Sequence, residues 1–192
     1  TIFYELPIEL QNARMKNIDI NDKKRTKVIK WLKEFYDSYL KDKHQKGLYL
    51  HGSFGSGKTY LIIAMLNELA KKKVSIAAVY YPFLLRNLKE SFSEDYKERI
   101  DYLLNVDILL LDDLGAENVT PWARDEILGT ILQYRMDNNL TTFFTSNLTI
   151  EELEEHLSGK KGELDKVKAR RIIERIKQLT TDLELISVNR RK

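Results

Sequence analysis

The segment GSFGSGKT, residues 52 to 59, has the residue types and the spacing that bind a chain of phosphates. Its glycines let the backbone fold around an anion with N–H groups pointing inward, and the positive end of the following helix adds attraction. Lys58 would reach the β- and γ-phosphates of a triphosphate, and the Thr59 hydroxyl would bind Mg²⁺. A glycine turn with a solvated lysine is the alternative, which the predicted flanking strand and helix disfavour. The predicted nucleotide contacts are Gly52, Ser53, Phe54, Gly55, Ser56, Gly57, Lys58, Thr59 and Tyr60.

A pair of carboxylates, Asp112 and Asp113, follows the apolar run ILLL. A strand that ends there would deliver both side chains to the carboxyl edge of a sheet, where ligands bind in such folds. We assign Asp112 to Mg²⁺, directly or through water, and Asp113 to positioning or deprotonating the attacking water. A carboxylate turn or a helix cap is the alternative, and it loses weight because the pair follows a phosphate-binding motif.

Asn147 and two arginines would complete the site. Asn147 follows the apolar stretch TTFFTS, where its amide would hydrogen-bond the water or the γ-phosphate, but asparagine suits a turn or a helix cap equally well. Arg171 and Arg175 are four residues apart and so share one helix face. Such a basic face is most often solvated. In a ring or filament ATPase, however, an arginine of one subunit completes the site of the next and neutralises transition-state charge.

Alternating strands and helices would position these residues. The predicted strands cover 47–51, 74–81, 107–111, 141–146 and 182–188. The first predicted helix is capped by Asn21 and reaches Leu40, and further helices are predicted over about 58–72, 83–104 and 167–179. Another helix would begin with Thr120 as its cap and Pro121 at its first position. One more would begin with a capping box from Thr149 to Glu152. Near-continuous apolar strands separated by helices predict an α/β fold, a parallel five-stranded sheet flanked by helices.

Composition is that of an ordinary globular domain with one core, since 43% of the 192 residues are hydrophobic and 32% are charged. A net charge of +3 is too small to indicate a nucleic-acid partner by itself. The sequence has no cysteine, which excludes disulfides and thiolate zinc sites within it. With no apolar run of membrane-spanning length and no signal peptide, we expect a cytoplasmic protein. Because the chain opens on Thr1, we expect a natural amino-terminal part to be absent.

Several segments together resemble a known family. HGSFGSGKT, LLLDDLGAE, FFTSN, ARRIIERI and the terminal NRR resemble the AAA+ ATPase domain, a P-loop NTPase, of bacterial helicase loaders of the DnaI/DnaC type, particularly the primosomal DnaI branch. The resemblance runs from about residue 14 to the end, and DDLGAE and WARDEILGTILQYRM are its most specific parts. It implies ATP and Mg²⁺ as cofactors. It also implies these roles: Lys58 and Thr59 in Walker A, Asp112 and Asp113 in Walker B, Asn147 as sensor 1, Arg175 as the arginine finger, and Arg190 or Arg191 as sensor 2.

Two departures from the family pattern matter. Most AAA+ proteins carry glutamate after the metal-binding aspartate, and Asp113 is shorter by one methylene group. Because a general base must come within hydrogen-bond distance of its proton, we expect hydrolysis to be slow or to need a partner that adjusts the geometry. Because few residues follow the helix of Arg175, we expect this chain to lack the helical lid domain common in AAA+ proteins, as loaders of this type do.

Residues 80–103 mix aromatic and basic side chains that could stack on bases and follow a phosphate backbone: Tyr80, Tyr81, Phe83, Phe92, Tyr96, Arg86, Lys89, Lys97 and Arg99. The same segment holds a core-facing helical stripe (Leu84, Leu85, Leu88, Phe92) and acidic residues that would repel phosphate (Glu90, Glu94, Asp95, Glu98). The residues alone favour core packing. The resemblance favours contact with single-stranded DNA.

We therefore predict an ATPase that loads a hexameric replicative DNA helicase, engages single-stranded DNA and self-associates through Arg175 acting in trans. Residues 1–45 would form a linker and a helix, residues 46–192 the AAA+ ATPase core, and an absent amino-terminal domain would hold the helicase. Two rivals stay open. One is a transposition helper ATPase of the IstB type, and the other is a nucleotide-gated adaptor that binds ATP without hydrolysing it.

Overall fold

A single parallel sheet forms the centre of the computed structural model, which describes residues 1–4, 6–19, 22–90, 93–159 and 163–185. The strands lie in the order β1-β3-β4-β5-β2-β6, and every neighbouring pair is parallel. They are β1 Ile2–Tyr4, β2 Gly47–Gly52, β3 Ile76–Tyr80, β4 Ile108–Asp112, β5 Thr141–Ser146 and β6 Thr180–Leu185.

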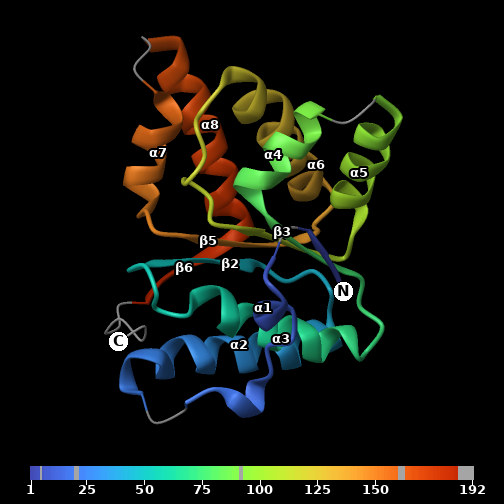
Figure 1. Cartoon of the computed structure of the whole chain (residues 1–192). Helices are drawn as coiled ribbons and strands as arrows, with labels where there is room; N and C mark the ends of the chain where they lie inside the picture. The colour runs from blue at the N-terminus through green and yellow to red at the C-terminus, as the bar shows by residue number, and fades with distance from the viewer. Residues whose placement is uncertain (5, 20–21, 91–92, 160–162, 186–192) are drawn as a thin grey trace.

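Helices cover both faces of this sheet (Figure 1). On one face lie α1 Ile8–Gln11, α2 Lys23–Lys41 and α3 Lys58–Ala70. On the other lie α4 Tyr81–Glu90, α5 Ser93–Asn105, α6 Gly129–Asp137, α7 Ile150–Ser158 and α8 Glu163–Leu179. The short 3-10 helix Met15–Asn17 lies between α1 and α2 in the chain.

Each face of the sheet has its own apolar cluster. In β4, Leu109 and Leu111 join the cluster beneath α4 to α8, and Ile108 and Leu110 join the cluster beneath α1 to α3. A strand buried on both faces needs apolar side chains at successive positions. This is why β4 is an unbroken apolar run in the sequence.

The predicted α/β architecture is confirmed, and a strand is present at each predicted position. The last strand, predicted over 182–188, is β6 Thr180–Leu185, and residues 186–188 of that prediction lie outside the described residues. The prediction of a five-stranded sheet omitted one strand, because β1 adds a sixth at the edge by pairing with Ala77–Val79 of β3. Three residues are too few to show a strand pattern, so the pairing depends on tertiary contact. The predicted boundary between residues 45 and 46 stays a prediction.

Some helix boundaries differ from those expected. Asp22 caps α2 by accepting a hydrogen bond from the Lys24 N–H, at 3.0 Å; the predicted cap, Asn21, lies outside the described residues. The region predicted as one helix over about 83–104 contains two, α4 and α5. The predicted capping box at the start of α7 is confirmed, with Thr149 and Glu152 each bonded to the other's backbone N–H.

A π-helix, Trp122–Leu128, precedes α6 without interruption. The predicted cap is present, since Thr120 Oγ1 accepts a hydrogen bond from the Ala123 N–H at 3.1 Å. Buried Arg124 connects the π-helix to α7 and α8, through hydrogen bonds to the Leu157 carbonyl of α7 and the Asp165 carboxylate of α8. Wider π turns are uncommon and often occur at functional sites.

The strand order brings three strand ends together. β5 lies between β4 and β2, so the residues after these strands meet at one edge of the sheet. The phosphate loop follows β2. Asp112 is the last residue of β4 and Asp113 comes directly after it, and Asn147 comes directly after β5. Among the described residues, no helix is both long enough and apolar enough to cross a membrane.

Candidate nucleotide-binding site

The loop between β2 and α3 turns through glycines with left-handed backbone angles. The φ angles are 151° at Gly52, 78° at Gly55 and 86° at Gly57, a region that side chains with a Cβ rarely adopt. Gly57 is the N-cap of α3, and no side chain of the described residues caps that helix. A helix start without a side-chain cap leaves backbone N–H groups for an anion, which is the arrangement that a phosphate requires.

Lys58 is buried, with 8% of its surface exposed, and its ammonium is held by neutral oxygens. The Nζ atom donates hydrogen bonds to the carbonyls of Gly52 (3.2 Å) and Ser53 (3.0 Å) and to Asn147 Oδ1 (3.0 Å). Burial lowers the pKa of Lys58, and the Asp113 and Asp112 carboxylates oppose that shift. A phosphate would give this ammonium a charged acceptor, and charge-assisted hydrogen bonds are the stronger kind.

Asp112 connects the phosphate loop to the ends of β4 and β5. Its Oδ1 accepts hydrogen bonds from the hydroxyls of Thr59 and Thr145, each at 2.6 Å. Burial raises the pKa of Asp112, and the two hydroxyl donors counteract this effect. The predicted Mg²⁺ ligands, Thr59 and Asp112, are therefore in direct contact.

These residues fit Mg²⁺ bound together with a nucleotide. Mg²⁺ commonly takes one or two protein oxygens and completes its octahedron with phosphate oxygens and water. Within the described part of the chain, no cluster of three or more His, Cys, Asp or Glu residues could hold a metal by itself. The Thr59 hydroxyl and the Asp112 carboxylate are the residues that would supply the protein's share of such a site.

Asp113 has an unusual backbone and a side chain turned toward β3. Its φ of 60° lies in the left-handed region, which non-glycine residues seldom occupy. The backbone N–H donates to Thr145 Oγ1 at 2.9 Å, and the carboxylate Oδ2 accepts a hydrogen bond from the Tyr80 hydroxyl at 3.2 Å. Burial and the Asp113 carboxylate raise the pKa of Tyr80, which keeps the phenol protonated as the donor.

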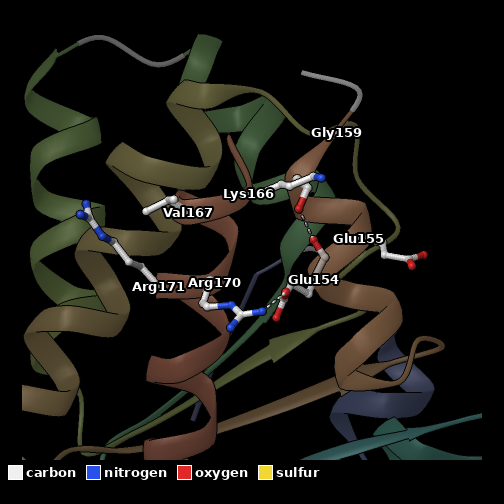
Figure 2. Close-up of a pocket in the computed structure, with 8 residues that line it drawn as sticks. Glu154, Glu155, Gly159, Lys166, Val167, Arg170 and Arg171 are labelled. Carbon is white, nitrogen blue, oxygen red and sulfur yellow. Dashed lines mark hydrogen bonds and ion pairs between the residues drawn. The ribbon is translucent and has the colours of Figure 1, made fainter. Parts of the chain in front are cut away.

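The arginines of α8 lie apart from these residues. Arg175 is half-buried, and its Nη1 donates to the Gly129 carbonyl at 3.4 Å, where the π-helix meets α6. Figure 2 shows the pocket between α7 and α8, about 720 Å³, with Arg170 directed at Glu154 (3.4 Å) and Arg171 pointing away from α7. No hydrogen bond or ion pair among the described residues joins Arg175 to Lys58, Asp112 or Asp113. Arg190 and Arg191 lie outside the described residues.

The aromatic and basic segment of residues 80–103 divides between core and surface. Leu84, Leu85 and Leu88 are buried, as a core-facing stripe requires. Tyr81 is also buried, with 1% of its surface exposed, which fits the core packing that the residues alone favoured and leaves its ring no exposed face for a base. Phe83 is 42% exposed, and the basic residues Arg86, Lys89 and Lys97 are exposed as well. Phe92 lies outside the described residues.

Two residues beside the site, Arg25 and Thr145, were not identified in the sequence analysis. Arg25, in α2, is buried and donates from NH2 to the Ser56 carbonyl at 3.2 Å, which supports the phosphate loop from beneath. Thr145 bonds both aspartates through its hydroxyl. Arg25 is far from the motif in sequence, whereas Thr145 lies at the end of β5, where a polar side chain in an apolar strand was the available clue.

Comparison with known proteins gives consistent matches. Residues 11–185 match the family model described as IstB-like ATP binding protein. The chain is 41% identical over 185 residues to the replicative helicase loader DnaI of Bacillus subtilis (strain 168), a match that covers 95% of this chain and 60% of that protein. A crystal structure of DnaI has a TM-score of 0.86 and 47% identity, covering 95% of this chain and 96% of the crystallised one.

A further solved structure, a putative primosome component from Streptococcus pyogenes serotype M3, has a TM-score of 0.80 and 37% identity, with 99% and 94% of the two chains covered. The chain spans 60% of the length of the Bacillus subtilis DnaI protein, so the match concerns that part alone. From these matches, and from the phosphate loop and strand ends described above, the chain belongs to the IstB-like ATP-binding family, among the AAA+ domains of replicative helicase loaders of the DnaI/DnaC type.

Proposed function

We propose that this AAA+ domain binds ATP with Mg²⁺ and hydrolyses it to ADP and phosphate. The observation that carries the proposal is the 2.6 Å hydrogen bond from Thr59 to Asp112, which joins the phosphate loop to the end of β4. Bound ATP supplies the γ-phosphoryl group, and Mg²⁺ offsets its charge. Lys58 holds the β- and γ-phosphate oxygens through Nζ, and the Thr59 hydroxyl and the Asp112 carboxylate hold the metal.

The remaining roles concern the attacking water. The Asn147 amide, whose Oδ1 accepts a hydrogen bond from Lys58 Nζ, orients the water or the γ-phosphate. Asp113 accepts a proton from that water as its oxygen attacks phosphorus and the bond to the β-phosphate oxygen breaks, with ADP leaving. Asp113 is one methylene shorter than glutamate and its Oδ2 accepts a hydrogen bond from Tyr80, so we expect slow turnover that a partner accelerates.

Arg175 completes the site of a neighbouring copy in this proposal. Among the described residues, its guanidinium makes no hydrogen bond to the phosphate loop of its own chain. The Arg175 side chain, in α8, is half-buried and so remains partly accessible to a neighbouring copy. An arginine supplied in trans neutralises charge in the transition state and makes hydrolysis depend on assembly. The γ-phosphate would then order the interface between copies, and hydrolysis would release it.

At the level of the whole protein, we propose that this ATP switch loads a hexameric replicative DNA helicase onto single-stranded DNA. Support comes from the 41% identity to a replicative helicase loader. Because the matched family is described as IstB-like, a transposition helper ATPase remains the alternative to a helicase loader. Capture of a hexameric helicase rather than a transposase distinguishes the two.

The test uses Arg175→Ala, with Arg170→Ala on the same helix as the matched control. Phosphate release and transfer of a hexameric helicase to circular single-stranded DNA are measured for both variants and the wild type. We expect Arg175→Ala to lower both activities by about tenfold or more, because an arginine finger contributes at least that much. Arg170→Ala should retain both. If Arg175→Ala leaves turnover and loading unchanged, the proposal fails.

A further inference from the structure

Arg25 is a charged residue at the start of the buried stripe of α2. The other buried side chains of that helix are hydrophobic, at the spacing of one helix face: Val28, Ile29, Leu32, Phe35 and Tyr39. Arg25 lies on the same face, and only 6% of its surface is exposed. Burying a guanidinium costs free energy that a hydrophobic side chain would not cost. Stability alone would therefore favour a hydrophobic residue at this position.

The Arg25 side chain ends at the phosphate loop. Its Nη2 donates a hydrogen bond to the Ser56 carbonyl at 3.2 Å. The same nitrogen fills the space beside Gly57, since a Cβ added to that glycine would overlap it. Ser56 is fully buried, so its carbonyl needs a donor from the protein, and Arg25 supplies one.

The hydrogen bond at Ser56 fixes the direction of the Gly57 N–H. The C=O and the N–H of one trans peptide group point in opposite directions, so a donor that holds the Ser56 carbonyl on one side directs the Gly57 N–H to the other. No acceptor in the described part of the chain binds this N–H, whereas the Gly57 carbonyl accepts from the Leu61 N–H at 3.2 Å. The Gly57 N–H is therefore one of the groups that the start of α3 leaves for a phosphate.

The charge of Arg25 also affects how well this N–H donates. A hydrogen bond from a charged donor is stronger than one from a neutral donor, and hydrogen bonds in a chain polarise one another. A guanidinium on the Ser56 carbonyl therefore makes the Gly57 N–H of the same peptide group a better donor to an anion. Orientation and polarisation both act on phosphate binding, although Arg25 lies beneath the loop.

We propose that Arg25 is a positioning residue of the nucleotide site, which orients and polarises the peptide group between Ser56 and Gly57 so that its N–H binds phosphate. Backbone N–H groups of such a loop hold the α- and β-phosphates, which ATP and ADP share. Arg25 therefore contributes to the affinity for both nucleotides and not to the hydrolytic step, which uses Asp113 and Asn147. The inference rests on the proposed binding of ATP and adds a residue of α2 to it.

The experiment compares Arg25→Met, Arg25→Lys and a control, Lys27→Met, with the wild type. Methionine fills a buried space without a charge, and lysine keeps a cation that can donate to the Ser56 carbonyl. Lys27 is exposed on the same helix and forms no ion pair with another described residue, so Lys27→Met removes one charge away from the loop.

Four properties of the 192-residue chain are measured. Calorimetry gives the affinities for ATP and for ADP, and steady-state phosphate release gives KM and kcat. Urea unfolding gives the stability. The NMR signal of the Gly57 amide proton is followed during titration with ADP, because a proton that donates to a phosphate moves downfield.

We expect Arg25→Met to weaken the binding of ATP and of ADP alike by about tenfold, the size of one hydrogen bond to a charged group. Because turnover is slow, KM should rise by the same factor, roughly tenfold, while kcat stays within about twofold of the wild type. The urea midpoint should not fall, since a hydrophobic side chain replaces a buried charge. Arg25→Lys should recover most of the affinity, and Lys27→Met should behave as the wild type.

A purely structural role for Arg25 would give a different pattern. Affinity and urea midpoint would then fall together in Arg25→Met, and its Gly57 amide proton would shift as in the wild type once ADP saturates the site. That result overturns the inference, and so does wild-type affinity of Arg25→Met for both nucleotides, or a loss of affinity for ATP alone. If Arg25→Met does not fold, the wild type decides, because a Gly57 amide proton that does not move downfield with ADP also overturns the inference.

The same measurements separate failure of this inference from failure of the proposed function. If the wild type binds neither ATP nor ADP, both fail. If the wild type binds both nucleotides and Arg25→Met binds them equally well, the proposed function stands and the inference falls. If the affinities change as expected but no variant and no wild-type protein releases phosphate, the proposed hydrolysis fails and the inference stands.

Discussion

The ammonium of Lys58 and the amide oxygen of Asn147 lie 3.0 Å apart, so a hydrogen bond ties the phosphate loop to the end of β5. Lys58 is 89 residues from Asn147 in the sequence, and the contact exists because β2 and β5 are neighbours in the sheet. A γ-phosphate would compete for the same ammonium. In the proposed function this relationship would let Asn147 sense what Lys58 binds, which can be tested by changing the charge at residue 147.

Asn147→Asp should weaken ATP binding by about tenfold or more, because a carboxylate of the same size would pair with Lys58 and repel the γ-phosphate. ADP should be affected less, since it lacks that phosphate. Calorimetric titration with both nucleotides checks the prediction. Asn138→Asp, at the exposed end of α6, is the control for an added charge. Equal affinity of the wild type and Asn147→Asp for ATP would contradict it.

Thr59→Val should raise the Mg²⁺ concentration needed for half-maximal ATP binding by about tenfold. The substitution keeps the side-chain shape but removes the hydroxyl that donates to Asp112, and Mg²⁺ tolerates few departures from its octahedron. A Mg²⁺ titration of fluorescent ATP analogue binding measures the effect. Thr26→Val, an exposed threonine of α2, serves as control. An unchanged Mg²⁺ requirement would remove Thr59 from the metal site.

His156 should give the domain a small stability that depends on pH. The Glu117 carboxylate, 3.7 Å away, raises the pKa of His156 above its ordinary value of 6.5, against the opposing effect of burial. The contribution is therefore complete below pH 6.5 and disappears as the pH rises through the raised pKa. We expect it to be less than about 1 kcal/mol.

Urea unfolding of the wild type and of His156→Gln at several pH values tests this. The difference in free energy of unfolding should be larger at pH 6 than at pH 8.5. His44→Gln, on the exposed connection between α2 and β2, should show no such trend. A difference that grows with increasing pH would have the wrong sign and would refute the assignment.

Arg135→Leu should destabilise the fold by roughly 3 kcal/mol or more. The Arg135 side chain is fully buried and donates to the Thr142 hydroxyl and to backbone carbonyls beside β4 and β5, among them Val106 and Thr141, each at 2.7 Å. Leucine would leave those carbonyls buried without a donor, which is costly.

Denaturant unfolding measures the loss at Arg135. Arg170→Leu on the exposed face of α8 should change stability by no more than about 0.5 kcal/mol, because exposed ion pairs contribute little. A similar small effect for Arg135→Leu would show that its hydrogen bonds contribute nothing net to the fold.

Local signals in the sequence were sufficient for much of the site. The motif from Gly52 to Thr59 can be recognised when a strand precedes it and a helix follows it, and the structure has both, β2 and α3. Asp112 and Asn147 could be placed because parallel strands end at one edge, so a polar residue after an apolar run is brought to that edge. The structure has Lys58, Asp112 and Asn147 together for this reason.

Other features depend on tertiary contacts that no local pattern records. Arg25 reaches the phosphate loop only because α2 packs beneath it, and Tyr80 reaches Asp113 only because β3 lies beside β4. Strand β1 is too short to show a period, and the π turns after Trp122 look like an ordinary helix in the sequence. Tyr81 belongs to a segment for which the residues alone favoured core packing, and its side chain in α4 is buried.

The most direct test of the account is phosphate release from ATP by the 192-residue chain, titrated with single-stranded DNA and compared with Lys58→Ala. The account predicts slow turnover that DNA increases and that Lys58→Ala abolishes, because this lysine is the cation that the phosphate loop brings to the nucleotide. ATP binding without any phosphate release, with or without DNA, would contradict it and leave an ATP-gated adaptor in which Asp113 does not act as a base.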